Sequence, residues 1–150
     1  INQEYQMHCS QKLNIMKTGM LHLHHYLPYI FSLVLLISIV RAYLGKIANP
    51  KKDKLLLLTL ILAHIQLLVG FYLLFPFPEV EMSVIMKDSI LRFKFIEHPS
   101  IMVLAVALIT IAKIKSKKMV DVVKANKTIF SYFTVALVLI AMRFPWDKIF

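Results

Sequence analysis

Four stretches of the sequence contain no Asp, Glu, Lys or Arg, and they leave this chain few folds that it can adopt. They cover residues 18–40, 55–78, 98–112 and 128–142. The first two are 23 and 24 residues long, and a helix needs about 20 residues to cross a hydrocarbon core of about 30 Å. None of the four alternates polar and apolar residues as a membrane β-strand does. The sequence therefore predicts an all-α integral membrane protein.

The expected architecture is an up-down four-helix bundle in one transmembrane domain over residues 18–150. We expect its spans at about residues 20–43, 55–75, 93–114 and 128–146. The last two uncharged stretches have 15 residues each, which is about 22 Å of helix. To cross the core, the third span must therefore begin near residue 93, and the fourth must include "RFPW", with Trp146 as an interfacial anchor.

Two segments are expected outside these spans. Between the second and third spans, "VEMSVIMKDSILRFKFIEHP" places apolar residues at roughly helical spacing among charges, which predicts a short amphipathic segment along the outer surface. Residues 1–17 are polar and lack an apolar core, so we expect a flexible outer tail and not a cleavable signal peptide. Within this tail, Met16 followed by Lys17 is a natural start.

The formal net charge of +10 is explained by membrane topology and does not require nucleic acid as a partner. The first connection holds five Lys and Arg residues against one Asp, and the third holds six Lys against one Asp. The second holds three basic residues against four acidic ones. Because basic connections stay on the cytoplasmic side, we expect connections one and three inside and both termini outside.

The single cysteine excludes several kinds of site. Cys9 has no second cysteine with which to form an internal disulfide or a thiolate metal cluster. The sequence also lacks C-x-x-C-H, the motif for covalent attachment of c-type haem. Any haem would therefore be held without a covalent link to the chain.

Ionisable residues inside a bilayer are costly and are functional candidates by default. In this sequence they are His22, His24, His25, His64, His98 and Glu97. Counted from the outer ends of their spans at about 1.5 Å per residue, His25 lies about 6 Å deep, His98 about 10 Å and His64 about 12 Å. Because three spans thus carry a histidine at similar depth, two imidazoles from facing helices could hold a haem iron in the bundle.

The predicted iron ligands are His64 and His98, with His22 or His25 of the first span as alternates. His22 and His25 are three residues apart and share one helix face, whereas His24 points elsewhere. Each histidine also has a structural interpretation. Those of the first span can bind headgroups or water at the interface, His64 can pair with a neighbouring helix, and His98 can form a cap with Glu97.

Further groups are expected around the ligands. Gln66 and Glu97 are candidates for orienting the imidazoles, and Arg92 and Lys94 could pair with haem propionates at the outer interface. Pro28 lacks a backbone N–H, so it frees the carbonyl of His24 and should bend the first span. Histidines with a third ligand could instead bind copper or zinc, and the candidate copper ligands are Met20 and Met102.

Four segments resemble one group of proteins. They are "GMLHLHHYLPY", "LILAHIQLLVGFYL", "MKDSILRFKFIEHPSIMVLAVALITIAKIKSKK" and "ALVLIAMRFPW". They are similar to short four-span bacterial membrane proteins labelled cytochrome b-like, which carry G-L-L-H-L-H, A-H-x-Q-L-L-x-G, R-F-x-x-x-E-H and a closing Pro-Trp. The resemblance covers residues 17–146. It implies a four-helix protein of the bacterial inner membrane.

The resemblance also bears on which histidines are used. The positions shared with the group are His22, His24, His64, Glu97 and His98. His25 departs from the pattern, since the group has another residue there. The resemblance therefore favours His22 or His24 in the first span, against the preference from helical periodicity.

Two functions follow as hypotheses. The first is a b-type cytochrome-like protein that carries electrons through a histidine-ligated haem near the outer leaflet, with quinol or respiratory-complex subunits as partners. The second is a non-catalytic accessory subunit of a larger membrane complex, with structural histidines. Neither is a self-contained enzyme, and either allows a homo-oligomer in the lipid bilayer. A transport role is disfavoured, because only Pro28 interrupts a span.

Overall fold

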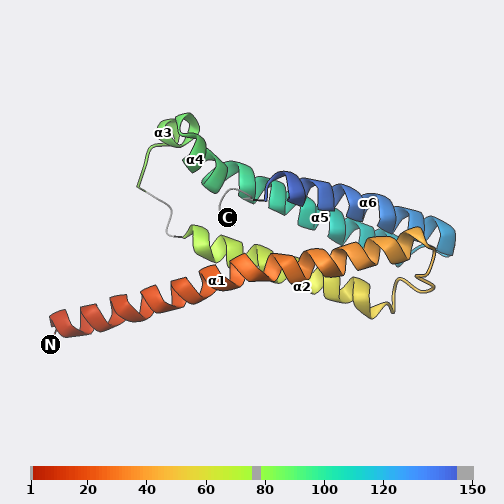
Figure 1. Ribbon diagram of the computed structural model, residues 1–150, viewed down its shortest axis with the longest axis horizontal. Coiled ribbons are helices and arrows are strands. Elements are labelled where there is room, and N and C mark those ends of the chain that lie inside the picture. The colour runs from red at the N-terminus through yellow and green to blue at the C-terminus, as the bar shows by residue number, and fades with distance from the viewer. Residues whose placement is uncertain (1, 76–78, 145–150) are drawn as a thin grey trace.

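The structure is a computed structural model that describes residues 2–75 and 79–144, the side chains of residues 2–6 and 9 excepted. Within these residues the chain is helical and contains no strand, which confirms the predicted all-α class. The long helices are α1 (Asn2–Tyr43), α2 (Lys54–Leu74), α5 (His98–Ser116) and α6 (Val122–Met142) (Figure 1). Between α2 and α5 lie the short helices α3 (Met82–Lys87) and α4 (Ser89–Arg92) and the π-helical turn η1 (Phe93–Glu97).

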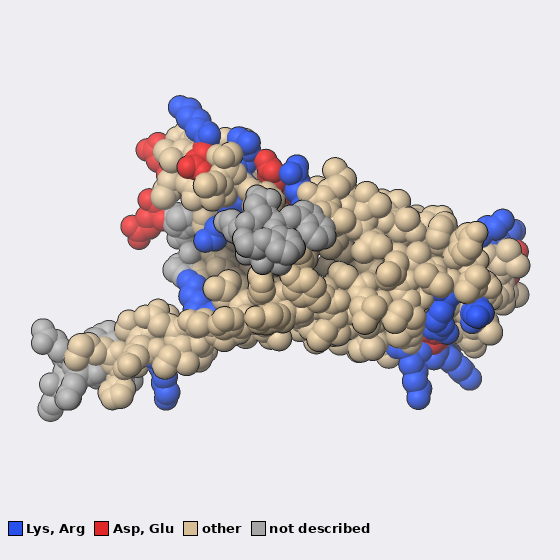
Figure 2. Space-filling model, in the orientation of Figure 1, with Lys and Arg blue, Asp and Glu red and all other residues tan. Residues whose placement is uncertain are grey.

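Four helical segments of the described chain are long and apolar enough to cross a membrane. They are Ser10–Tyr43, Lys54–Leu74, Ser89–Ser116 and Val122–Met142. The second agrees closely with the predicted span at 55–75. The third includes residues 93–97, which the predicted third span needed in order to cross the hydrocarbon core. All four keep their charged side chains near their ends. Figure 2 shows an uncharged middle on the face in view, with Lys and Arg at both ends and most of the visible Asp and Glu at the end that carries α3 and α4.

The first helix is longer than predicted. Backbone helix begins at Asn2 and runs without interruption to Tyr43, so residues 2–17 belong to α1 and do not form a separate irregular segment. The reason is local, because neither glycine nor proline occurs before Gly19 and Gln, Lys, Leu and Met are good helix formers. In Figure 1 this N-terminal part of α1 extends beyond the other helices.

The ends of the helices follow their sequence signals. Gly45 has a positive φ of 66°, its N–H bonds the carbonyl of Ala42, and the N–H of Lys46 bonds the carbonyl of Arg41. This is the Schellman pattern that ends a helix at glycine. Helix α6 begins six residues before the predicted span, because the carboxylate of Asp121 caps it by accepting from the N–H groups of Val123 and Lys124.

Helix α6 consequently reaches 21 residues without "RFPW", which the predicted span at 128–146 had included to gain length. The expected anchor Trp146 lies outside the described residues.

The predicted amphipathic segment is divided at Asp88. Its first half forms the six-residue helix α3, in which Ile85 is buried. At Asp88 the carboxylate accepts from the N–H groups of Ile90 and Leu91 and starts a new helix that continues through η1 into α5. The second half of the predicted surface segment is therefore the beginning of the third long helix.

The four long helices pack side by side through one shared core. Helix α1 contacts α2 and α6, and α5 contacts α6 and α2. Leu35, Ile109, Ile129 and Phe133 are fully buried between them. The outward faces carry exposed Leu, Ile and Val side chains. Burial of apolar side chains against each other thus joins helices whose outer surfaces are themselves apolar.

Polar contacts join the helices at the end that carries the two lysine-rich connections. The guanidinium of Arg41 donates two hydrogen bonds to Asp53, at 2.8 and 3.2 Å, and Asp53 also accepts from the N–H of Leu56 at the start of α2. Burial by itself raises the pKa of Asp53, but the hydrogen bonds from Arg41 and Leu56 outweigh it and hold this pKa below its ordinary value.

Two more side chains bind the first connection to the opposite helices. Lys113 of α5 is buried and donates to the carbonyl of Pro50. Asn126 of α6 accepts from the backbone N–H of Ile47 and donates to its carbonyl, at 3.3 and 3.0 Å. Lys113 therefore has a structural role, although the sequence indicated only a topology signal for the lysines of these connections.

Candidate functional site

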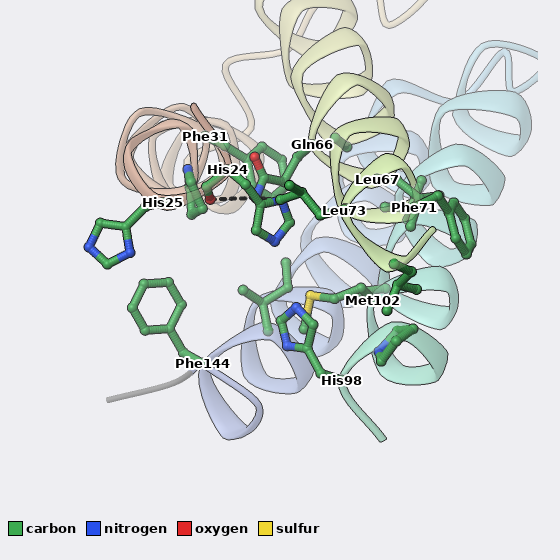
Figure 3. A pocket seen from close by; sticks show the side chains of 18 of the residues that line it. His24, His25, Phe31, Gln66, Leu67, Phe71, Leu73, His98, Met102 and Phe144 are labelled. Atoms are coloured by element: carbon green, nitrogen blue, oxygen red, sulfur yellow. Dashed lines mark hydrogen bonds between the residues drawn. The ribbon is translucent and has the colours of Figure 1, made fainter. Parts of the chain in front are cut away.

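A cavity of about 330 Å³ lies between the four long helices, in the half of the molecule away from the lysine-rich connections. This volume falls in the lower part of the range for small-molecule sites. Its walls are mostly apolar, with Phe31, Leu67, Phe71 and Met102 among them (Figure 3). The few polar groups that line it are therefore the candidates for chemistry.

Two histidines from different helices face each other in this cavity. His24 comes from α1 and His98 from the first residue of α5, and their ring centroids are 6.3 Å apart with the ring planes at 78°. Both line the cavity, as Figure 3 shows. Two imidazoles are therefore close together, and the residue from the first span is His24. The comparison of depths had named His25, His64 and His98, and the expected alternates from the first span were His22 and His25.

The hydrogen bond of His98 shows which of its ring nitrogens carries the proton. Its Nδ1 lies 3.0 Å from the backbone carbonyl of Arg143, just after the end of α6. A carbonyl only accepts, so Nδ1 carries the proton and donates. In the neutral ring, Nε2 then holds a free lone pair. This is the arrangement typical of metal-ligating histidines, whose other nitrogen is fixed by a carbonyl.

His24 is held by Gln66 of α2. The amide nitrogen Nε2 of Gln66 donates to the backbone carbonyl of His24 at 3.0 Å and lies 3.0 Å from its Nδ1. That carbonyl is the one that Pro28 deprives of its helical N–H partner. Because the carbonyl demands a donor, the amide nitrogen must be the atom placed there, and Nδ1 of His24 accepts from it. In the neutral ring, Nε2 therefore carries the proton.

The same amide has an unsatisfied atom. Oε1 of Gln66 is buried and has no hydrogen-bond partner among the described residues. A buried acceptor without a partner costs roughly 1–3 kcal/mol. Such an atom in a native structure calls for an explanation, and an unbound ligand or an alternative side-chain position can supply one.

Gly70 makes room for the ring of His24. A Cβ added at this position would lie 3.0 Å from Cε1 of His24, closer than side chains ordinarily approach. Gly70 follows Gln66 by four residues and so lies on the same face of α2. The sequence contains this signal in "QLLVG", but a glycine in one helix does not by itself indicate which side chain of another helix approaches it.

The other histidines lie outside the pair. His22 is exposed and stacks on Tyr26 with ring centroids 6.4 Å apart. His25 reaches the edge of the cavity but is exposed, and its ring points away from His24 toward Tyr26 and Tyr29.

His64, the first predicted ligand, is exposed on the outer face of α2 and does not line the cavity. Two residues correspond to about 200° around a helix. Because Gln66 faces inward, His64 must face outward.

The charged residues near the cavity also differ from their expected roles. Arg92 donates from Nε to Glu97 at 2.9 Å and from Nη1 to the carbonyl of Met86. Glu97 also pairs with Arg143, at 3.4 Å. Arg92 and Glu97 are thus paired with each other, and neither forms a hydrogen bond or ion pair with His98 within the described residues. Lys94 is the cation that lines the cavity.

The described residues contain no group of three His, Cys, Asp or Glu side chains that could hold a metal ion. Of the two candidate copper ligands, Met102 lines the cavity wall and Met20 is not among the residues that line it.

No protein-family model matches this chain, and no curated protein and no solved structure matches it either. The function proposed for it therefore rests on the residues and the geometry described above.

Proposed function

We propose that this chain is a multi-pass protein of the bacterial inner membrane, with its four long helices as an up-down bundle. Four apolar helices of sufficient length support this. So do the first and third connections, in which Lys and Arg far outnumber Asp, and at their end Figure 2 shows Lys and Arg with little Asp or Glu. By the positive-inside rule the lysine-rich end faces the cytoplasm. Both termini and the cavity of His24 and His98 then lie toward the outer side.

We propose further that the cavity binds b-type haem, with His24 and His98 as the axial ligands. The observation that carries this is the separation of the two rings, 6.3 Å between centroids. Two imidazoles on opposite sides of one metal atom, with metal–nitrogen bonds of about 2.0–2.1 Å, place their centroids roughly 6 Å apart. The two histidines are thus spaced for one iron, in a cavity with apolar walls.

The protonation of the rings fits this proposal with one side-chain adjustment. His98 already presents a lone pair on Nε2. His24 presents a proton there, because its Nδ1 accepts from Gln66. If the Gln66 amide turned so that Nε2 kept the carbonyl of His24 and Oε1 reached Nδ1, the proton would move to Nδ1. Nε2 of His24 would then be free to ligate, and the buried Oε1 would gain a partner.

The remaining residues of the cavity have simple roles under this proposal. Haem supplies reversible one-electron transfer at its iron. The apolar side chains around the pair exclude water and disfavour charge, which helps to set the potential. Lys94 at the edge of the cavity is placed to pair with a carboxylate of the ligand. The chain would then be an electron carrier between a quinol or respiratory subunit and an acceptor, and not a self-contained enzyme.

The test is the reduced-minus-oxidised absorption spectrum of detergent-purified protein from haem-replete cells. We expect sharp α and Soret bands, which His24→Ala and His98→Ala each abolish. The matched controls are His64→Ala and His22→Ala, which should keep the bands because both side chains lie outside the cavity. A flat spectrum of the wild-type protein, or loss of the bands in His64→Ala but not in His24→Ala, would refute the assignment.

A second candidate is an accessory subunit in which the histidines are structural. The hydrogen bonds from Gln66 to His24 favour it, because they complete a link between α1 and α2 without any ligand. In this case the purified protein is colourless, and Gln66→Leu lowers its free energy of unfolding. The expected loss is about 1–3 kcal/mol, because the carbonyl of His24 is left without a hydrogen bond. Under the haem proposal, the same change would also alter the absorption spectrum.

A further inference from the structure

The outward face of α2 carries a regular stripe of exposed side chains. Its members are Leu57, Ile61, His64, Leu68 and Phe71, all of them exposed, and Phe71 also reaches the cavity wall. They follow one another at intervals of four and three residues in alternation. This is the heptad spacing by which two helices pack along their length at a small crossing angle. We define these five residues as the α2 stripe.

His64 is the only polar residue of the α2 stripe and lies at its centre. It is ten residues from each end of α2, or about 15 Å from each. In a bilayer this is the middle of the hydrocarbon core. Exposed side chains on the outward faces of α5 and α6, such as Val103 and Val138, are apolar there and are satisfied by lipid. An exposed imidazole at that depth carries polar nitrogens that lipid cannot satisfy.

The imidazole of His64 is satisfied on one side. Its Nδ1 lies 2.8 Å from the carbonyl of Leu60, one turn earlier, so Nδ1 donates and Nε2 holds a lone pair that points away from the helix. Within the described residues, Nε2 has no hydrogen-bond partner. A polar atom in hydrocarbon requires a hydrogen bond, and histidine commonly finds one on a neighbouring transmembrane helix.

We propose that the α2 stripe is the interface of a parallel homodimer, in which His64 meets His64 of a second copy. This rests on the membrane location proposed above and not on haem. Copies inserted with the same topology have His64 at the same depth. A two-fold axis along the membrane normal therefore places the one polar position of the stripe opposite itself, with apolar residues facing apolar residues on both sides. A second copy thus provides the required partner by symmetry.

The two imidazoles can pair as neutral rings. One ring keeps Nδ1–H on the carbonyl of its own Leu60 and accepts at Nε2. The other carries its proton on Nε2 and donates. No proton is gained or lost, since each ring still has one N–H. The Leu60 carbonyl released in the second copy retains its helical bond. The second ring must turn away from that carbonyl, because its Nδ1 then holds a lone pair and both atoms are acceptors.

The experiment is disulfide cross-linking in isolated membranes, with Cys9→Ser as the background. Ile61→Cys and Leu68→Cys place a thiol on either side of His64, and Val138→Cys on the outward face of α6 is the matched control. We expect cross-linked dimers at positions 61 and 68, several-fold more than at position 138. A dimerisation constant measured in bilayers should fall about three- to tenfold in His64→Leu, the range for interhelical hydrogen bonds in membranes.

Several outcomes would overturn the inference. They are equal cross-linking at all three positions, monomers in the membrane, cross-links to a different protein, or a dimer that His64→Leu does not weaken. Extraction of the membranes at alkaline pH distinguishes the two proposals. If the protein is washed off, the membrane location itself is wrong. If it stays embedded but monomeric, only the dimer is wrong.

Discussion

The contact between Asn126 and Ile47 should be a main determinant of stability at the lysine-rich end. Asn126 is 4% exposed and Ile47 is fully buried. The side chain of Asn126 accepts from the N–H of Ile47, donates to its carbonyl, and also donates to the carbonyl of Val122. It thereby fixes the turn after α1 to the start of α6, two segments that are 79 residues apart in sequence.

Asn126→Ala leaves the N–H and the carbonyl of Ile47 without partners. A buried backbone group without a partner costs roughly 1–3 kcal/mol, so the two together predict a loss of about 2–6 kcal/mol in the free energy of unfolding. Val122 contributes little, because its carbonyl retains the helical bond. Asn126→Asp should destabilise more than alanine at neutral pH, since it places a carboxylate oxygen against two carbonyl oxygens.

The assay is equilibrium unfolding in mixed micelles of a mild detergent and dodecyl sulfate, followed by helical circular dichroism. Lys127→Ala is the matched control, because Lys127 is the exposed neighbour on the same helix. The reasoning is refuted if Asn126→Ala unfolds within about 0.5 kcal/mol of Lys127→Ala, the range of ordinary surface substitutions. An aspartate variant more stable than the alanine variant would show that the donor function of the amide is unimportant.

Three further predictions concern the core, the cavity and pH. Phe133→Ala empties a fully buried position and should cost about 3–5 kcal/mol in the same unfolding assay. Gly70→Ala should displace the ring of His24, visible as a shift of its ¹⁵N-histidine NMR signals, whereas Gly19→Ala, with open space around it, should leave them unchanged. The pKa of Asp53 is lowered from 3.8, so its contribution to stability is present above that pH and is lost as the pH falls through the lower folded value. Asp53→Asn, which keeps a capping oxygen, should therefore lose less stability than the wild type between neutral pH and pH 3.

The local features of the fold were predictable because they depend on neighbours in sequence. The apolar runs predict helices of membrane-crossing length, and the second of them matches α2 to within one residue at each end. The errors lie at helix ends. Asp88 and Asp121 start helices by accepting backbone N–H bonds, and a side-chain cap of this kind is easily missed where hydropathy alone is followed. Because residues 121–127 include charged side chains, hydropathy did not indicate that the first turns of α6 lie there.

The sequence indicated that histidines lie at similar depth on three spans. It did not indicate which of these histidines face one another. Position along a helix follows from a rise of about 1.5 Å per residue, so histidines at similar depth could be recognised on three spans. The choice among neighbours required the rotation of each helix. Gln66 and His64 differ by two positions in sequence, yet one contacts His24 and the other faces outward.

The sequence by itself determined the helical class, the apolar spans and the charged ends, because each is set by the transfer free energy of local side chains. Only the tertiary structure decided that His24 faces His98, that Gln66 satisfies the carbonyl freed by Pro28, and that His64 is left on the surface. The physical reason is that each residue turns a helix by about 100°. The face that a helix presents to its neighbours is therefore selected by packing across the whole core, and not by any one segment.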